Sequence, residues 1–127
     1  AKRTFVLCVD NRTDVTRRGT LGARLHIAKT PAPPYYAVIA PTVLSGDASG
    51  FPELAQRLTE MARGVDGFLD IESCFHGNFV LAVSYWRSLE AIEVWRQHAR
   101  HQYAKNMGKA RWFEAYFTRI ARVEHDY

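Results

Sequence analysis

The chain has 127 residues, which is the size of one domain with a single hydrophobic core. Hydrophobic residues make up 47% of it and charged residues 24%, a balance that excludes a largely disordered protein. The net charge of +4 comes from basic residues scattered among apolar ones, so we expect no nucleic-acid partner. No apolar run approaches the roughly 18 residues needed to cross a bilayer. The apolar run at residues 4–9 is too short for a secretion signal, so we expect a cytoplasmic protein without membrane contact.

Two parts of the chain differ in composition. Residues 1–34 are predicted to be an N-terminal extension, with strand-like runs at residues 4–9 and 24–28. The extension ends in the proline-rich connector Lys29–Pro34, and proline fixes φ and removes an N–H donor, so this connector should be extended. Residues 35–127 are predicted to form the main domain, on which the extension would lie unless it lies on a partner subunit.

The main domain shows strand and helix patterns in regular alternation. Two predictions rest on local signals: Gly77-Asn78 is typical of a two-residue hairpin turn, and Ser88 is a good N-cap. In chain order we expect a strand at residues 35–44, a helix from Phe51 to Gly64, strands at 67–75 and 79–86, a helix from Ser88 to Met107, a short helix at 110–116 and a strand at 118–125.

This βαββαβ order predicts an α+β, ferredoxin-like fold, in which a four-stranded antiparallel sheet carries both helices on one face. The other face of such a sheet is left apolar. A second copy of the sheet is the simplest cover, so we expect a homodimer.

Aromatic and histidine side chains concentrate in the C-terminal half, on or near the second long helix. The candidates for a functional site are Tyr85, Trp86, Trp95, His98, His101, Trp112 and Tyr116. A pocket lined by such groups would suit a flat aromatic or macrocyclic ligand. Each tryptophan is open to a second interpretation as a core residue, and Trp112 and Tyr116, four positions apart, can simply pack on each other.

His98 and His101 are three positions apart and should share one face of the helix. They can be solvated, can transfer protons or bind substrate, or can ligate a heme iron or another metal. No third ligand is placed by the sequence, so we expect no metal centre. Because His98 follows Val94 by one turn, it is predicted to be the more buried of the two.

Asp70 and Glu72 share one face of the second strand and are either a carboxylate pair for acid–base chemistry or part of a solvated face. The sequence has no phosphate loop and no dinucleotide-binding glycine motif, which argues against bound NAD or FAD though not against free flavin.

Several stretches of residues 64–124 are similar to one known family. They are Gly64-Val65-Asp66-Gly67-Phe68-Leu69, Ser84-Tyr85-Trp86-Arg87-Ser88-Leu89-Glu90-Ala91-Ile92, Trp95-Arg96-Gln97-His98 with His101, Arg111-Trp112-Phe113-Glu114-Ala115-Tyr116 after Gly108, and Arg119-Ile120-Ala121-Arg122-Val123-Glu124. Through these stretches the chain resembles the antibiotic biosynthesis monooxygenase family. The resemblance covers about residues 35–127.

The resemblance implies a dimeric α+β barrel with a pocket between sheet and helices in each subunit. Cofactor-independent members let an electron-rich phenolic substrate react directly with dioxygen, while the protein promotes deprotonation and excludes water. We therefore expect a monooxygenase for a small aromatic or polyketide-like substrate, with no required cofactor. His98 and Trp86 are its catalytic candidates, and its substrate-binding candidates are Tyr85, Trp95, His101, Trp112 and Tyr116.

Heme-degrading relatives carry an asparagine on the first strand and a histidine late in the second helix. Here residues 36–44 contain no asparagine, and about Lys105 falls at the histidine position. Heme degradation is therefore not favoured. A heme-binding protein or heme-dependent enzyme using His98 or His101 remains an alternative, and a non-catalytic ligand-binding dimer is the second alternative.

Overall fold

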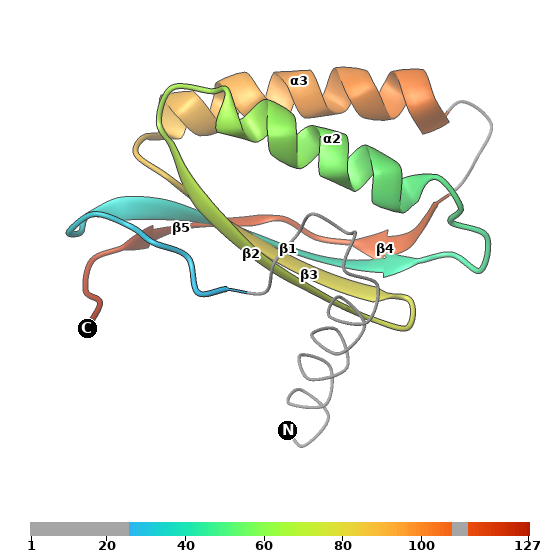
Figure 1. The fold of residues 1–127 in the computed structure, drawn as a ribbon, viewed down its shortest axis with the longest axis horizontal. Coiled ribbons are helices and arrows are strands. Elements are labelled where there is room, and N and C mark those ends of the chain that lie inside the picture. Colours follow the sequence, from blue (N-terminus) through green and yellow to red (C-terminus); the bar gives the residue numbers. More distant parts are fainter. Residues whose placement is uncertain (1–25, 108–111) are drawn as a thin grey trace.

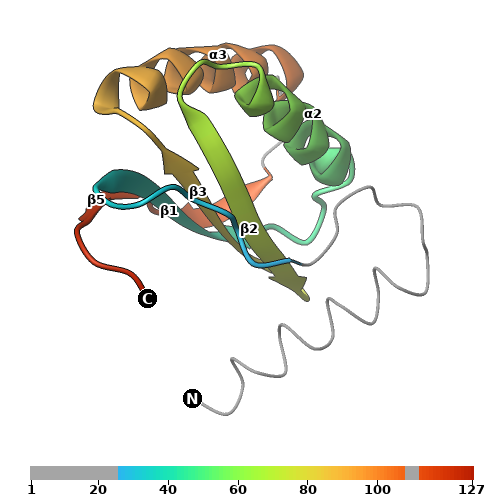
Figure 2. The ribbon, with the colours of Figure 1, turned by 60° about the vertical axis from the view of Figure 1, so that its left-hand side comes forward.

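The strands and helices follow the predicted order in a computed structural model that describes residues 26–107 and 112–127. The elements are β1 (Tyr35–Leu44), α2 (Phe51–Arg63), β2 (Phe68–His76), β3 (Phe79–Trp86), α3 (Leu89–Met107), β4 (Phe113–Tyr116) and β5 (Arg119–Val123). Both α2 and α3 lie on the same face of one antiparallel sheet (Figure 1, Figure 2). The predicted α+β, ferredoxin-like fold is confirmed.

The sheet has the order β2-β3-β1, and its fourth position is shared by β4 and β5. The C-terminal end of β1 pairs with β4, and the N-terminal half of β1 pairs with β5. Pro41 lies between these two ladders, and its carbonyl accepts a hydrogen bond from the Phe117 N–H at 3.2 Å. Because the N and O atoms of one strand residue point to the same side, the missing N–H of Pro41 faces the interruption between β4 and β5. A proline in this central strand therefore costs no ladder hydrogen bond.

The predicted short helix at residues 110–116 is wrong for its described part, because residues 113–116 are strand β4. Thr42–Leu44 of β1 would otherwise present an unpaired edge, and backbone groups at such an edge need partners. The Trp112 carbonyl extends the pairing by accepting from the Ser45 N–H at 2.7 Å. Tertiary pairing thus overrides the helix-like spacing of Trp112 and Tyr116.

The N-terminal predictions fall only partly within the described residues. Residues 26–28, the described part of the second predicted strand, are not in a strand. The Ala28 N–H donates to the Glu72 carboxylate of β2 at 2.7 Å instead of to a neighbouring strand. The predicted strand at residues 4–9 lies outside the described residues.

Two local predictions are confirmed by the structure. Gly77, with φ of 56°, begins the two-residue turn between β2 and β3. The Ser88 hydroxyl accepts a hydrogen bond from the Ala91 N–H at 3.1 Å and so caps α3. Helix α2 is capped differently from α3: its N-cap residue is Gly50, and no side-chain hydrogen bond from the described residues caps this helix.

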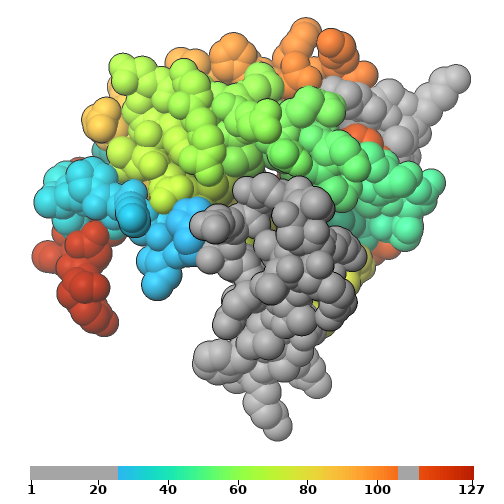
Figure 3. Space-filling view, in the orientation of Figure 1, coloured from blue at the N-terminus to red at the C-terminus, as the bar shows by residue number. Residues whose placement is uncertain are grey.

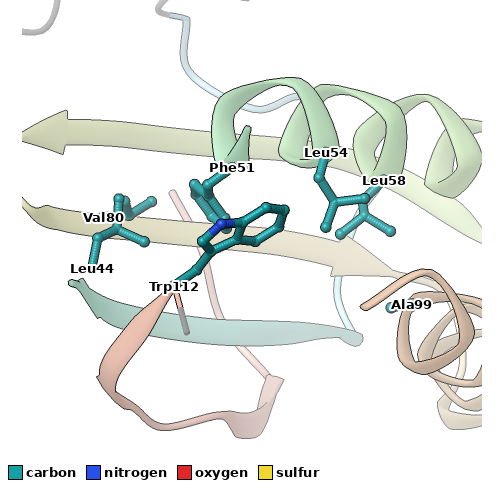
Figure 4. Packing of buried hydrophobic residues seen from close by; sticks show 7 residues of the cluster. All are labelled: Leu44, Phe51, Leu54, Leu58, Val80, Ala99 and Trp112. Carbon is teal, nitrogen blue, oxygen red and sulfur yellow. The ribbon is translucent and has the colours of Figure 1, made fainter. Parts of the chain in front are cut away.

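Two clusters of buried side chains fill the space between the helices and the sheet. The first comprises Leu44, Phe51, Leu54, Leu58, Val80, Ala99 and Trp112, and the second comprises Val38, Ala62, Trp86, Ala91 and Ile92. Figure 4 shows the Trp112 indole of the first cluster beside the Phe51 ring. The strand members of the clusters, Val38 and Leu44 of β1 and Val80 and Trp86 of β3, come from alternate positions, so the intervening strand residues point to the opposite face, which we call the open face.

Candidate functional site

Trp86 lies inside the second core cluster and is 0% exposed. Its ring packs on Phe68 and Trp95, with centroid separations of 5.1 and 5.7 Å. Its Nε1–H donates to the Ser84 hydroxyl at 2.8 Å. Both the apolar surface and the polar atom of this indole are therefore satisfied within the protein, as expected of a structural tryptophan.

Trp95 also faces the core, from the first turns of α3. It packs against both clusters, and its Nε1–H donates to the Leu58 carbonyl of α2 at 3.2 Å. This hydrogen bond joins the two helices. Trp95 and Trp86 thus occupy the position between sheet and helix that the sequence predicted, but their indole N–H groups are bonded to the protein.

Tyr85 points to the open face, because neighbouring residues of a strand alternate between faces. Its hydroxyl donates to the Glu72 carboxylate at 2.8 Å, and its ring contacts Tyr35 at 5.9 Å. Burial, followed by the hydrogen bond and charge of Glu72, raises the pKa of Tyr85. Tyr85 and Trp86 therefore cannot line one cavity within a single chain.

Asp70 and Glu72 hold the segment before β1 against β2. Glu72 accepts from the Ala28 N–H at 2.7 Å, and Asp70 accepts from the Lys29 N–H at 2.9 Å and contacts the His26 ring at 3.3 Å. Figure 3 shows this segment, in blue, against the yellow-green surface of β2. Burial by itself would raise the pKa of Asp70, but the donated hydrogen bonds outweigh it and hold that pKa below the ordinary value. These carboxylates act as a clasp for the segment 26–29, hereafter the carboxylate clasp.

His98 and His101 are both exposed, so neither imidazole lies in the core. The reason is the orientation of α3: Ile92 and Ala99 face the core, whereas Val94, one turn before His98, is 49% exposed. The two imidazoles lie on the solvent side of the helix. Their catalytic and binding roles stay predictions, but they would act from outside the layer between helix and sheet.

A cluster of five aromatic rings lies where the N-terminus of α2, the second half of α3 and β4 meet. We call it the β4 aromatic cluster; its members are Phe51, Tyr103, Trp112, Phe113 and Tyr116. Phe113 is central, with ring centroids 5.6 Å from Phe51, 5.5 Å from Tyr103 and 5.6 Å from Tyr116. Trp112 contacts Phe51 at 6.1 Å. Trp112 is buried and Tyr116 is 68% exposed, so the cluster runs from the core to the surface.

The structure thus distributes the predicted site residues over four places instead of one. Trp86 and Trp95 lie in the core, Tyr85 lies on the open face, His98 and His101 lie on the outside of α3, and Trp112 and Tyr116 belong to the β4 aromatic cluster. Sequence reasoning did not select Tyr103 as a site residue. The signal was present, since the spacing of Ile92, Trp95, Ala99 and Tyr103 places them on one face of the helix.

Within residues 26–107 and 112–127, no group of three or more His, Cys, Asp or Glu side chains could hold a metal ion. The exposed His98 and His101 do not fit a heme enclosed between α3 and the sheet. In the same described part of the chain, neither helix is long and apolar enough to span a membrane.

The fold and these sites define a ferredoxin-like α+β domain with a hydrophobic core under its helices and an aromatic cluster at one end of them. Residues 34–107 match the antibiotic biosynthesis monooxygenase family, and the chain belongs to that family. It is 43% identical over 99 residues to the uncharacterized protein YqjZ of Bacillus subtilis, a match that covers 77% of this chain and 87% of YqjZ.

Solved structures share the fold at low sequence identity. PA3566 from Pseudomonas aeruginosa superposes with a TM-score of 0.58 at 16% identity, covering 77% of this chain and all of that one. Rv0793 from Mycobacterium tuberculosis gives a TM-score of 0.57 at 19% identity, covering 72% and 94% of the two chains. SO0527 from Shewanella oneidensis gives 0.60 at 13% identity, covering 71% and 91%.

Proposed function

We propose that the protein is a monooxygenase that oxidises a small, electron-rich aromatic or polyketide-like compound with dioxygen. Membership of the antibiotic biosynthesis monooxygenase family is the observation that carries this proposal. The β4 aromatic cluster supports it, because edge-on aromatic rings that reach the surface suit a flat aromatic ligand. The substrate would bind at this cluster, at the end of the layer between α3 and the sheet.

The proposed reaction draws its electrons from the substrate. An activated ring CH₂ group loses two hydrogens and becomes a carbonyl, one oxygen atom of O₂ enters that carbonyl, and the other leaves as water. An ionised phenol or enol makes the carbon electron-rich enough to react, and the protein favours this ion by binding it away from bulk water. No external reductant enters this balance.

Oxygen uptake by the purified protein tests the proposal. An oxygen electrode should record stoichiometric consumption of O₂ and substrate with at least one anthrone-type compound, which carries the activated ring CH₂ group, at a rate proportional to protein concentration. Chelator-treated protein should retain the rate, and its absorption spectrum should lack heme and flavin bands. No protein-dependent uptake across the panel would contradict a monooxygenase and favour the ligand-binding alternative, whereas a Soret band on hemin titration that is lost in His98→Ala would favour the heme alternative.

We also propose that a second copy of the chain covers the open face. Side chains on this face of β1 and β3 are apolar and half-buried: Ile39, Pro41, Val43, Phe79, Leu81 and Val83. An apolar sheet face of this kind is normally buried against another layer. Light scattering should give twice the mass of one chain, and Val83→Glu, which places a charge opposite Ile39 in the register, should give the monomer. A monomeric unmodified protein at about 100 µM would contradict this proposal.

A further inference from the structure

Tyr103 differs from the two tyrosines of the open face in having no hydrogen-bond partner for its hydroxyl among residues 26–107 and 112–127. Tyr85 donates to Glu72 at 2.8 Å and Tyr35 donates to Asp126 at 2.7 Å. The Tyr103 hydroxyl makes no hydrogen bond to another residue of the described chain, although its ring packs against the first core cluster. A phenol whose ring is largely buried normally finds a partner for its O–H.

Tyr103 is nevertheless not sealed inside the core. The residue is half-buried, so part of its side chain reaches the surface. Its phenol therefore lies at the boundary of an apolar, aromatic region.

That region is the β4 aromatic cluster. The Tyr103 ring meets Phe113 edge-on, with an interplanar angle of 74°, and Tyr116 contacts the same Phe113 ring. Tyr103 and Tyr116 thus flank Phe113 from α3 and from β4. A flat ring resting on this aromatic surface would find one available donor beside it.

The protonation state of Tyr103 decides what its hydroxyl can do. Burial raises the pKa of Tyr103, so the phenol stays neutral at physiological pH. A neutral phenol donates one hydrogen bond and does not act as a base. A donor beside apolar rings stabilises an oxygen that carries negative charge more than a neutral one.

We infer that the Tyr103 hydroxyl donates a hydrogen bond to the phenolic oxygen of a flat aromatic ligand seated on the β4 aromatic cluster. The inference rests on the proposed function for the class of its ligand. It assigns a binding residue that the ionised form of the substrate would contact directly. In the proposed reaction, this donor would favour the phenolate that precedes attack on dioxygen.

A matched pair of ligands tests the inference by calorimetric titration. The probes are 2-naphthol and 2-methylnaphthalene, which share the ring system, while only 2-naphthol carries an oxygen that can accept the hydrogen bond. The protein should bind 2-naphthol about 3- to 10-fold more tightly than the hydrocarbon, a ratio typical of one hydrogen bond. Tyr103→Phe should reduce that ratio to near one while leaving the affinity for the hydrocarbon unchanged.

The control variant is Tyr36→Phe, because Tyr36 packs against the second core cluster and its hydroxyl has no partner in the described chain. It should retain the preference for 2-naphthol. A preference that survives Tyr103→Phe, or no binding of either probe to the unmodified protein, would overturn the inference. If Tyr103→Phe does not fold, the Tyr103 ring signals in NMR spectra decide instead: they must shift with 2-naphthol more than with 2-methylnaphthalene.

The inference and the proposed function fail separately. A preference for 2-naphthol that is lost in Tyr103→Phe, together with no oxygen uptake on any substrate, would keep the donor and remove the monooxygenase. Oxygen uptake that is unchanged in Tyr103→Phe, with no effect on the ligand ratio, would keep the monooxygenase and remove the donor.

Discussion

Replacing Ser84 with alanine should destabilise the protein because it removes the partner of the buried Trp86 indole N–H. The two side chains are joined by a hydrogen bond of 2.8 Å, Trp86 is 0% exposed and Ser84 is 8% exposed, so water cannot replace the lost hydroxyl. Leaving a buried donor unpaired costs about 1–3 kcal/mol. For a chain of this size, that loss should lower the melting midpoint by roughly 4–10 °C.

A double-mutant cycle isolates this hydrogen bond. Ser84→Ala should destabilise the Trp86→Phe variant by at least about 1 kcal/mol less than it destabilises the unmodified protein. The reason is that the phenyl ring has no N–H group that would lose its hydrogen-bond partner. Urea unfolding followed by circular dichroism gives the free energies, with Ser73→Ala on β2 as a control expected to change little. Equal losses in both backgrounds would refute the structural interpretation of the Trp86–Ser84 hydrogen bond.

Three further predictions test the clasp, the outer face of α3 and a turn. Lowering the pH should release residues 26–29, because the depressed pKa of Asp70 contributes stability that is present above the ordinary pKa of an aspartate and is lost below about pH 4. Asp70→Asn should give the same loss of amide protection at pH 7, measured by hydrogen exchange. Full protection of these amides in that variant would contradict the carboxylate clasp. His98→Ala should retain oxygen uptake within about twofold in electrode assays, since its imidazole is exposed on the far side of α3; a loss beyond tenfold would restore its predicted catalytic role. Gly67→Ala should lower the free energy of unfolding by about 1–3 kcal/mol, measured by urea unfolding, because Gly67 has φ of 103° and an added Cβ would lie 2.8 Å from the Cβ of Ala91. Gly46→Ala is the control and should change this free energy little, because an added Cβ there meets nothing within 4 Å. Equal losses in the two variants would refute the steric argument.

The regular elements could be predicted because their signals are local. The Gly77-Asn78 turn fixes the β2–β3 hairpin and Ser88 fixes the start of α3, each through contacts within a few residues. Strand β4 could not be predicted this way. Its residues have helix-like spacing, and only the unpaired edge of β1, far away in the sequence, selects the strand.

The candidate site was harder to predict than the fold. Aromatic and histidine residues that are close in sequence need not point in the same direction from their strand or helix. Alternation along β3 already places Tyr85 and Trp86 on opposite faces, and this was available from the sequence. The orientation of α3 was not, since one face of the helix carries Ile92, Trp95 and Ala99 and another carries Ala91 and Val94, so apolar residues mark both faces. The structure resolves the choice by packing Ile92 and Ala99 against the core, which leaves His98 in solvent.

The most direct test of the proposed monooxygenase is the fate of labelled dioxygen. An anthrone-type substrate would be converted under ¹⁸O₂ in ordinary water. The mass of the product would be measured by mass spectrometry before its new carbonyl oxygen exchanges with water. Incorporation of one ¹⁸O atom per product molecule, dependent on the protein and retained after chelator treatment, is the predicted result. A product without the label, or a yield equal to that of the protein-free reaction, would contradict the proposal.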